Sequence, residues 1–276
     1  MERGRIAGLF VYPVKGCRGI TLDEVKVEPM GLAFDRRWLI VRPDGRFITQ
    51  REAPALARIV PQFSSGQLVL RLDAEPYAID LDQAGEPIEV AIWRDRFSAF
   101  TQPAAVDQAL SRFLERPVRL VKFDPTVHRP CSPEVSPPGA HAAFADEFPL
   151  LVTSTASLGR LNDVLMEHGQ EPVPMDRFRP NIVVEGLPAW AEDRLCEIRI
   201  GGLHLRLVTP CERCIVTTTD QITGARDSNE PIRTLRMLHA DPGGKPLFGW
   251  NAVPLTDNGD APILRLGAEI LGVAAP

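Results

Sequence analysis

The stretch "LCEIRIGGLHLRLV" (residues 195–208) decides the fold class. Apolar residues alternate with others on both sides of Gly201-Gly202, which is typical of two β-strands joined by a two-residue turn. In the register set by that turn, residue 200 faces 203 and residue 198 faces 205, so one side of the hairpin is apolar. We therefore expect a sheet with one buried face, lined here by Cys196, Ile198, Ile200, Leu203, Leu205 and Leu207.

The composition agrees with a fold made of many short strands. The 276 residues include 21 glycines and 26 prolines, which favours strands and turns over a helical bundle. A net charge of −5 argues against nucleic acid as a binding partner, because binding to the phosphate backbone usually requires a basic surface. The sequence shows no signal-peptide core and no run of about 18 apolar residues. We therefore expect a cytoplasmic protein with no membrane partner.

Local signals outline the first half of the chain. Asp44-Gly45 predicts a type I′ hairpin in which Val41 and Ile48 share one face. Residues 67–81 read as a second strand pair. Residues 103–115 predict the first helix, because apolar residues recur at helical spacing there and Pro117 follows.

The second half of the sequence predicts two more strands, a second helix and a final pair of strands. An apolar strand at 150–153 runs into a helix whose C′ position is Gly169. The run at 215–219, "IVTTT", predicts a strand because all five residues are β-branched. Residues 264–273 predict the last strand pair. The proline-rich segment at 124–140 is either a flexible linker or a lid over a site.

Cys211 and Cys214 form the one Cys-x-x-Cys motif, which has four interpretations. Structural zinc needs four ligands, usually from two paired motifs. A thioredoxin-type dithiol needs a following helix, whereas this sequence predicts a strand. The third interpretation is a pair of thiols in a turn without function. The fourth is a single thiolate, Cys214, ligating a metal held by an organic cofactor, with Arg213 beside it favouring the thiolate.

An organic cofactor with anionic groups would need cationic and amide partners, and several segments offer them. The hydroxyl cluster at 153–157, "TSTAS", opens a predicted helix, where free backbone amides favour phosphate. Each feature alone is common on protein surfaces, so the argument rests on their joint occurrence in an acidic chain. The basic and amide candidates are Lys15, Arg18, Arg36, Arg37, Arg51, Arg177, Arg179 and Asn181.

Six motifs in order resemble the MOSC family, and more narrowly the two-part MOSC proteins related to the mitochondrial amidoxime-reducing component. The motifs are "YPVKGCRG", "DRRWLIV", "FADEFPLLVTSTASLGRLN", "RFRPNIVVEG", "PCERCIVTTTDQITG" and "PLFGWNAV". The resemblance spans about residues 5 to 272. It implies a mixed, β-rich α+β fold with two domains. The first, at 1–118, would be a MOSC N-terminal β-barrel-like domain with a helical segment near 103–115, and 119–276 would be a MOSC β-barrel domain with a few helices.

The resemblance also implies a molybdenum cofactor (molybdopterin) between the two domains. Cys214, the second cysteine of its motif, would be the molybdenum ligand and the catalytic residue. The cofactor-binding residues that match the family are Lys15, Arg36, Ser154, Thr155, Ser157, Arg179, Asn181 and Asn251.

The sequence departs from the family at two positions of the site. Gly16 stands where relatives often have serine, which removes one side-chain hydrogen bond. Trp250 stands where relatives commonly have glutamine, and we expect it to reshape the pocket mouth. The chain shows no plant-type C-x4-C-x2-C run and leaves no room for the pyridoxal-phosphate sulfurase domain of some relatives. Pyridoxal phosphate binding is therefore a family-level association only.

The resemblance implies a molybdenum-dependent oxidoreductase acting on small N-hydroxylated substrates: amidoximes, hydroxylamines and N-hydroxylated bases. Asp220, His128 or Arg129 would assist protonation. We find no haem, iron–sulfur, flavin or nicotinamide motif, so an external donor, a ferredoxin- or cytochrome-like protein with its reductase, would supply electrons. The alternative is a non-redox carrier of the molybdenum cofactor or of persulfide sulfur. Turnover of benzamidoxime with an artificial electron donor separates the two.

Overall fold

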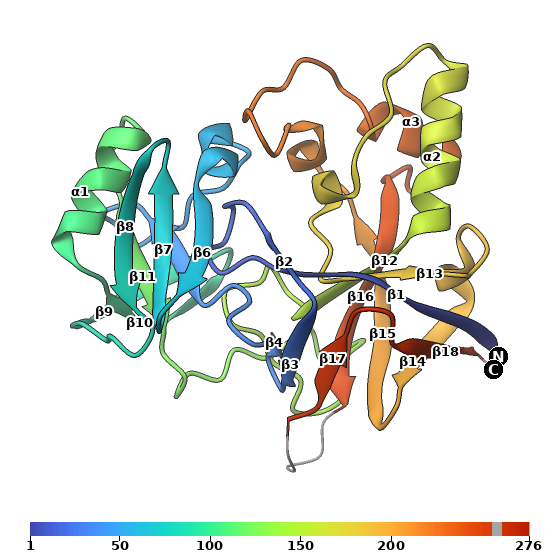
Figure 1. The fold of residues 1–276 in the computed structure, drawn as a ribbon, viewed down its shortest axis with the longest axis horizontal. Coiled ribbons are helices and arrows are strands. Elements are labelled where there is room, and N and C mark those ends of the chain that lie inside the picture. The colour runs from blue at the N-terminus through green and yellow to red at the C-terminus, as the bar shows by residue number, and fades with distance from the viewer. Residues whose placement is uncertain (256–260, 276) are drawn as a thin grey trace.

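The computed structural model describes residues 1–255 and 261–275, and its largest element is a closed β-barrel (Figure 1). Seven strands pair in the order β13-β12-β16-β15-β14-β18-β1, and β1 returns to β13. The pairs are antiparallel except β12 with β13, which are parallel. The strands are β1 (Glu2–Val11), β12 (Leu150–Ser154), β13 (Ile182–Glu185), β14 (Leu195–Ile200), β15 (Leu203–Glu212), β16 (Leu247–Leu255) and β18 (Glu269–Ala274).

The first strand of the chain closes this barrel. Leu9 of β1 pairs with Ile182 of β13, and Glu2 pairs with Gly272 of β18, so the two ends of the chain lie side by side. Conversely, β11 (Arg119–Phe123) lies after the predicted domain boundary but pairs with strands that precede that boundary. The domain boundary between residues 118 and 119 stays a prediction. Each predicted domain contributes a strand that pairs with strands of the other.

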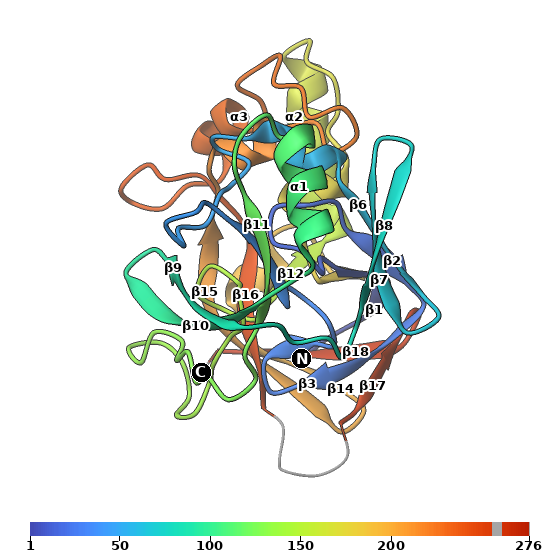
Figure 2. The ribbon, with the colours of Figure 1, turned by 90° about the vertical axis from the view of Figure 1, so that its left-hand side faces the viewer.

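The first half forms a second lobe, at the left of Figure 1. A four-stranded sheet has the order β5-β11-β10-β9, and β6, β7 and β8 form a three-stranded meander. Helix α1 (Ala104–Phe113) buries Val106 and Leu110 in the core of this lobe, on the side that faces the viewer in Figure 2. The strands are β5 (Trp38–Val41), β6 (Val60–Ser64), β7 (Gln67–Leu72), β8 (Glu75–Asp80), β9 (Pro87–Ile92) and β10 (Asp95–Thr101).

Short elements complete the described chain. Strand β2 (Ile20–Leu22) pairs with β1, and β17 (Ile263–Arg265), β3 (Glu24–Glu28) and β4 (Gly31–Leu32) form a small sheet. Within residues 1–255 and 261–275, no helix has the length and apolarity needed to span a bilayer. The remaining helices are α2 (Thr155–Glu167), α3 (Ile232–Leu238) and the 3-10 turns η1 (Pro54–Arg58), η2 (Met175–Phe178), η3 (Ala191–Arg194) and η4 (Ile215–Thr218).

The hairpin at 195–208 has the predicted register, with Ile200 opposite Leu203 and Ile198 opposite Leu205. The prediction that Cys196 is a core residue is wrong, because its side chain is only half-buried. The register of β14 against β18 shifts between Leu195 and Glu197, and Leu195, 3% exposed, takes the core position instead.

The predicted type I′ turn at Asp44-Gly45 is also wrong. The Gly45 amide donates to the Arg42 carbonyl, and Val41 faces Phe47, so the loop has three residues and the register moves by one. A two-residue loop would require a backbone N–H from Pro43, which has none. Gly45, at φ 80°, supplies the left-handed residue that a three-residue loop requires.

Two further predictions fail and two are confirmed. The run at 215–219 forms η4 and not a strand, because the Thr217 and Thr218 hydroxyls bond back to the Cys214 and Ile215 carbonyls. Strands β17 and β18 do not pair with each other but with β3 and with β1 and β14. The two predicted helices are confirmed as α1 and α2, and Gly169 ends α2 at φ 68°. The β-rich α+β fold class is confirmed.

Candidate functional site

A cavity of about 550 Å³ opens where the barrel meets the first lobe. Five cationic and three acidic side chains line it, although the whole chain is acidic. The cationic side chains are Lys15, Arg36, Arg51, Arg179 and Arg213, and the acidic ones are Asp146, Glu147 and Glu212. Six of the predicted site residues lie together on its wall, namely Lys15, Arg36, Arg179, Asn181, Cys214 and Asn251.

The predicted hydroxyls at the start of α2 do not line this cavity. Ser154 is buried and caps the helix, accepting from the Ala156 amide at 3.2 Å. Ser157 is buried and donates to Glu192 Oε1 at 2.7 Å. Thr155 is exposed on the helix surface. The structure therefore does not bring these three residues to the other six.

Arg36 and Asn181 line the cavity and connect the two lobes by hydrogen bonds. Arg36 Nη1 donates to the buried Asp35 carboxylate and, at 2.9 Å, to Asn181 Oδ1, and Nη2 donates to the Arg179 carbonyl at 3.3 Å. The Asn181 side chain, 1% exposed, also accepts from the Leu151 amide at 3.1 Å and donates to the Phe10 carbonyl at 3.2 Å. Asn181 therefore ties β1 to β12 and holds Arg36 in place.

The Tyr12 ring separates two guanidinium groups of the cavity wall. The guanidinium carbons of Arg36 and Arg179 lie 4.5 and 4.3 Å from the ring centroid. Burial raises the pKa of Tyr12 and lowers the pKa of Arg179. Arg179 Nη1 also donates to Gln221 Oε1 at 3.1 Å. These contacts fix two positive charges in position, and cation–π contacts of this kind contribute about 0.5–2 kcal/mol each.

Lys15 and Asp146 form an ion pair on the opposite wall. Lys15 Nζ donates to Asp146 Oδ1 at 2.9 Å and to the Phe144 carbonyl at 2.7 Å. Burial lowers the pKa of Lys15 to about 8, with Asp146 opposing that shift. Desolvation would raise the pKa of Asp146, but Lys15, Arg51 and Trp93 together lower it to about 2. Lys15 can therefore exchange a proton near neutral pH while Asp146 stays ionised.

Both thiols of the Cys-x-x-Cys motif lie on the cavity wall, Cys211 near the end of β15 and Cys214 in the segment that joins β15 to η4. Arg213 contacts Cys211, with Nη1 at 2.8 Å from its Sγ, and not Cys214. The guanidinium beside Cys214 belongs to Arg51, whose Nη2 is 3.3 Å from Sγ. The prediction that Arg213 supports the Cys214 thiolate is therefore wrong, and Arg51 of the first lobe has that place.

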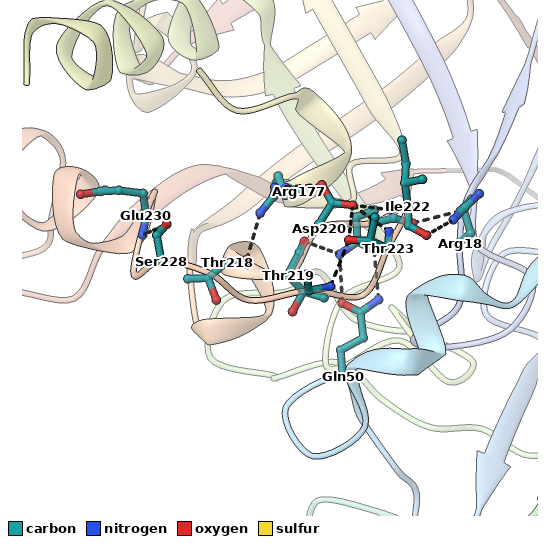
Figure 3. Close-up of polar contacts among 12 residues, drawn as sticks. Arg18, Gln50, Arg177, Thr218, Thr219, Asp220, Ile222, Thr223, Ser228 and Glu230 are labelled. Atoms are coloured by element: carbon teal, nitrogen blue, oxygen red, sulfur yellow. Dashed lines mark hydrogen bonds and ion pairs between the residues drawn. The ribbon is translucent and has the colours of Figure 1, made fainter. Parts of the chain in front are cut away.

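The segment after Cys214 holds Arg51 there. The Gln221 and Gln50 side-chain amides exchange two hydrogen bonds of 3.0 Å, and Arg226 Nη1 donates to the Arg51 carbonyl at 3.1 Å. Figure 3 shows this segment beside Gln50 and Arg18. Direct hydrogen bonds between the two lobes therefore hold this part of the cavity wall in place.

The predicted protonating residues do not reach the cavity, although Arg129 supports its wall by donating to the Ala145 and Asp146 carbonyls at 2.6 Å. Asp220 accepts from the Ile222 and Thr223 amides and from Arg177, as Figure 3 shows, so it shapes a turn. Arg129 is buried and pairs with Asp95 at 2.7 Å. His128 lies against His141, with ring centroids 4.7 Å apart. None of Asp220, His128 and Arg129 lines the cavity.

Trp250, expected at the pocket mouth, does not line the cavity, and its Nε1 donates to Asp193 at 2.8 Å. The tryptophan on the cavity wall is Trp93. Gly16 does lie on the wall at φ 84°, a backbone conformation that disfavours the serine of relatives.

The donors on the wall fit an anionic group. Arg213 Nε is buried and finds no partner among residues 1–255 and 261–275, whereas the two Nη atoms contact Cys211 Sγ and the Phe178 carbonyl. The surplus of cationic side chains favours a ligand that carries negative charge. In the same described residues, no group of three or more His, Cys, Asp and Glu side chains is placed to hold a metal ion by itself.

Comparison with known proteins places the chain in a family. Residues 3–117 match the MOSC N-terminal beta barrel domain and residues 140–270 match the MOSC domain. The chain belongs to the MOSC family, with both of these domains. It is 34% identical over 262 residues to mitochondrial amidoxime-reducing component 1 of Homo sapiens, across 89% of this chain and 75% of that protein. It is 30% identical over 279 residues to mitochondrial amidoxime reducing component 2 of Bos taurus, across 89% of this chain and 77% of that protein.

Proposed function

We propose that the protein is a molybdenum-cofactor-dependent oxidoreductase that reduces small N-hydroxylated compounds such as amidoximes. The observation that carries the proposal is the cavity itself, in which the Cys214 thiol faces a wall with more cationic than acidic side chains. The names of the relatives, amidoxime-reducing components, supply the reaction class. The reaction takes an amidoxime, two electrons and two protons to an amidine and water.

Different residues of the cavity would bind the cofactor, ligate the metal and transfer a proton. Lys15, Arg36, Arg179 and Arg213 would bind the anionic groups of molybdopterin through charge-assisted hydrogen bonds. Cys214 would supply the protein's thiolate to molybdenum, steadied by Arg51. The cofactor, when bound, supplies the two-electron removal of oxygen. Lys15, with its pKa lowered by burial to about 8, would hold and release a proton at Nζ.

The proposal also includes the electron donor and the cellular location of the enzyme. Electrons would come from a separate ferredoxin- or cytochrome-like protein with its reductase, because the sequence shows no second redox motif. We also propose a cytoplasmic location. The external donor rests on the proposed reaction, whereas the location is inferred from the sequence alone.

The test uses protein from a host that makes the molybdenum cofactor. Molybdenum and molybdopterin are quantified per chain, and conversion of benzamidoxime to benzamidine is followed with reduced viologen as donor. We expect Cys214→Ser to abolish turnover and Cys211→Ser, its matched control on the same wall, to keep a substantial part of it. Equal loss from both variants, with unchanged thermal unfolding, would favour a dithiol mechanism. A fully loaded wild-type protein without turnover would favour the carrier function.

A further inference from the structure

Trp93 stands at the wall of the cavity in an unusual position. It belongs to the two-residue loop between β9 and β10, where Ile92 pairs with Asp95. All four tryptophans lie in the described chain, and Trp93 is the exposed one, at 54%. A large aromatic side chain left half in solvent beside a cavity offers a ligand a flat apolar surface on which to pack.

The backbone of Trp93 is strained. Its φ of 52° lies in the left-handed region, which bulky residues rarely adopt and which asparagine or glycine would take more easily. Arg36 and Arg179, at 49° and 56°, are the other non-glycine residues of the cavity wall with positive φ among those described. Strain of this kind persists where the surroundings hold a residue in place, and it clusters at binding sites.

Three contacts hold the indole. Its Nε1 donates to Asp146 Oδ1 at 3.1 Å, and the Phe47 ring meets it edge-on with centroids 5.0 Å apart. The Arg51 guanidinium carbon lies 5.1 Å from the indole centroid, and Nη2 of the same Arg51 is 3.3 Å from Cys214 Sγ. A single side chain therefore separates the indole from the thiol.

We propose that Trp93 is the specificity-determining residue of the site. The Arg51 guanidinium lies over the indole ring, and the indole surface that stays exposed stacks the planar, delocalised part of an N-hydroxylated substrate, whose N–O group reaches past Arg51 toward Cys214. The substrate class is aryl and heteroaryl N-hydroxylated compounds. The cationic surplus of the wall disfavours cationic members of that class. The inference rests on the proposed reductase function.

The kinetic test compares two amidoximes with the same carbon skeleton, the planar aromatic benzamidoxime and the non-planar, saturated cyclohexanecarboxamidoxime. Aromatic pairing favours the planar ring by about 2- to 12-fold in kcat/KM, the equivalent of about 0.5–1.5 kcal/mol. Trp93→Asn removes the ring and suits the left-handed backbone, so we expect the preference to vanish without loss of stability. Trp93→Phe should keep part of it. Because the ring contact is remote from the N–O bond, the change should fall on KM and not on kcat.

A binding test works without turnover. Benzamide, a planar analogue that cannot be reduced, should quench tryptophan emission of the loaded protein saturably, and cyclohexanecarboxamide should not. The quenching should disappear in Trp93→Phe and persist in Trp250→Phe, the matched control outside the cavity. Unchanged substrate preference in Trp93→Asn, or quenching that survives Trp93→Phe, would overturn the inference. If neither amidoxime is turned over by wild type, the reductase proposal fails, whereas the binding test still decides whether Trp93 stacks planar compounds.

Discussion

Replacing Arg36 by alanine tests whether this cavity residue is also a structural one. Its side chain, 15% exposed, donates to the Asp35 carboxylate, which is 2% exposed and, among the described residues, also accepts from the Tyr12 amide. The variant Arg36→Ala therefore removes the ion-pair partner of a buried carboxylate and leaves Arg179 as a nearby positive charge, and the Asn181 amide oxygen loses one of its donors.

The magnitude follows from that burial. Removing one partner of a buried ion pair lowers the free energy of unfolding by about 3–5 kcal/mol. Each kcal/mol shifts Tm by about 2–4 °C in a chain approaching this size, so we expect a fall of roughly 6–20 °C. Arg51→Ala is the matched control, because Arg51 is exposed and the loss of its cation–π contact with Trp93 should change stability by no more than about 1 kcal/mol.

The assay is calorimetric unfolding together with urea titration of the apoprotein. Asp35→Asn in the Arg36→Ala background removes the unpaired charge and should recover at least about 1 kcal/mol. A Tm for Arg36→Ala within about 2 °C of wild type would refute the reasoning, as would a double variant less stable than Arg36→Ala alone.

Two further predictions concern pH and electrons. Burial would lower the pKa of His239, but hydrogen bonds to Asp193 and the Leu247 carbonyl raise it, and Glu192 adds to the rise. A raised folded-state pKa gives stability that is complete below the unfolded value of about 6.5 and is lost as pH rises through the folded value. The stability difference between wild type and His239→Gln should therefore shrink from pH 6 to pH 9 in urea titrations, and a constant difference would contradict this. Loaded protein should reduce benzamidoxime with reduced viologen but not with NADH alone, and sustained turnover with NADH and no added carrier would count against an external donor.

Local patterns predicted much of the fold. The Gly201-Gly202 turn fixed the register of its hairpin, and helical spacing located α1 and α2. Failures came where a backbone partner was missing or an alternative existed. Pro43 has no N–H for the expected turn, and threonine hydroxyls at 217 and 218 satisfy carbonyls in a 3-10 turn.

Only those residues of the candidate site that lie in recognisable motifs could be predicted from the sequence. The motifs placed Lys15, Arg36, Arg179 and Cys214 in one site, and the structure brings these four to one cavity. The contact between Arg51 and Cys214 joins residues 163 positions apart, and no local pattern indicates it. Trp93 carries no motif, since its importance comes from a strained loop that only the folded chain reveals.

The closure of the barrel by β1 has a consequence for biosynthesis. The ribosome makes β1 first, whereas its partner β13 begins at residue 182 and β18 at residue 269. At 5–20 residues per second, the apolar face of β1 waits about 10–35 s for β13, and longer for β18. During that time its edges are open to pairing with other chains. A nascent chain released early would therefore be prone to aggregate, and a holdase chaperone that covers β1 should raise the yield of folded protein.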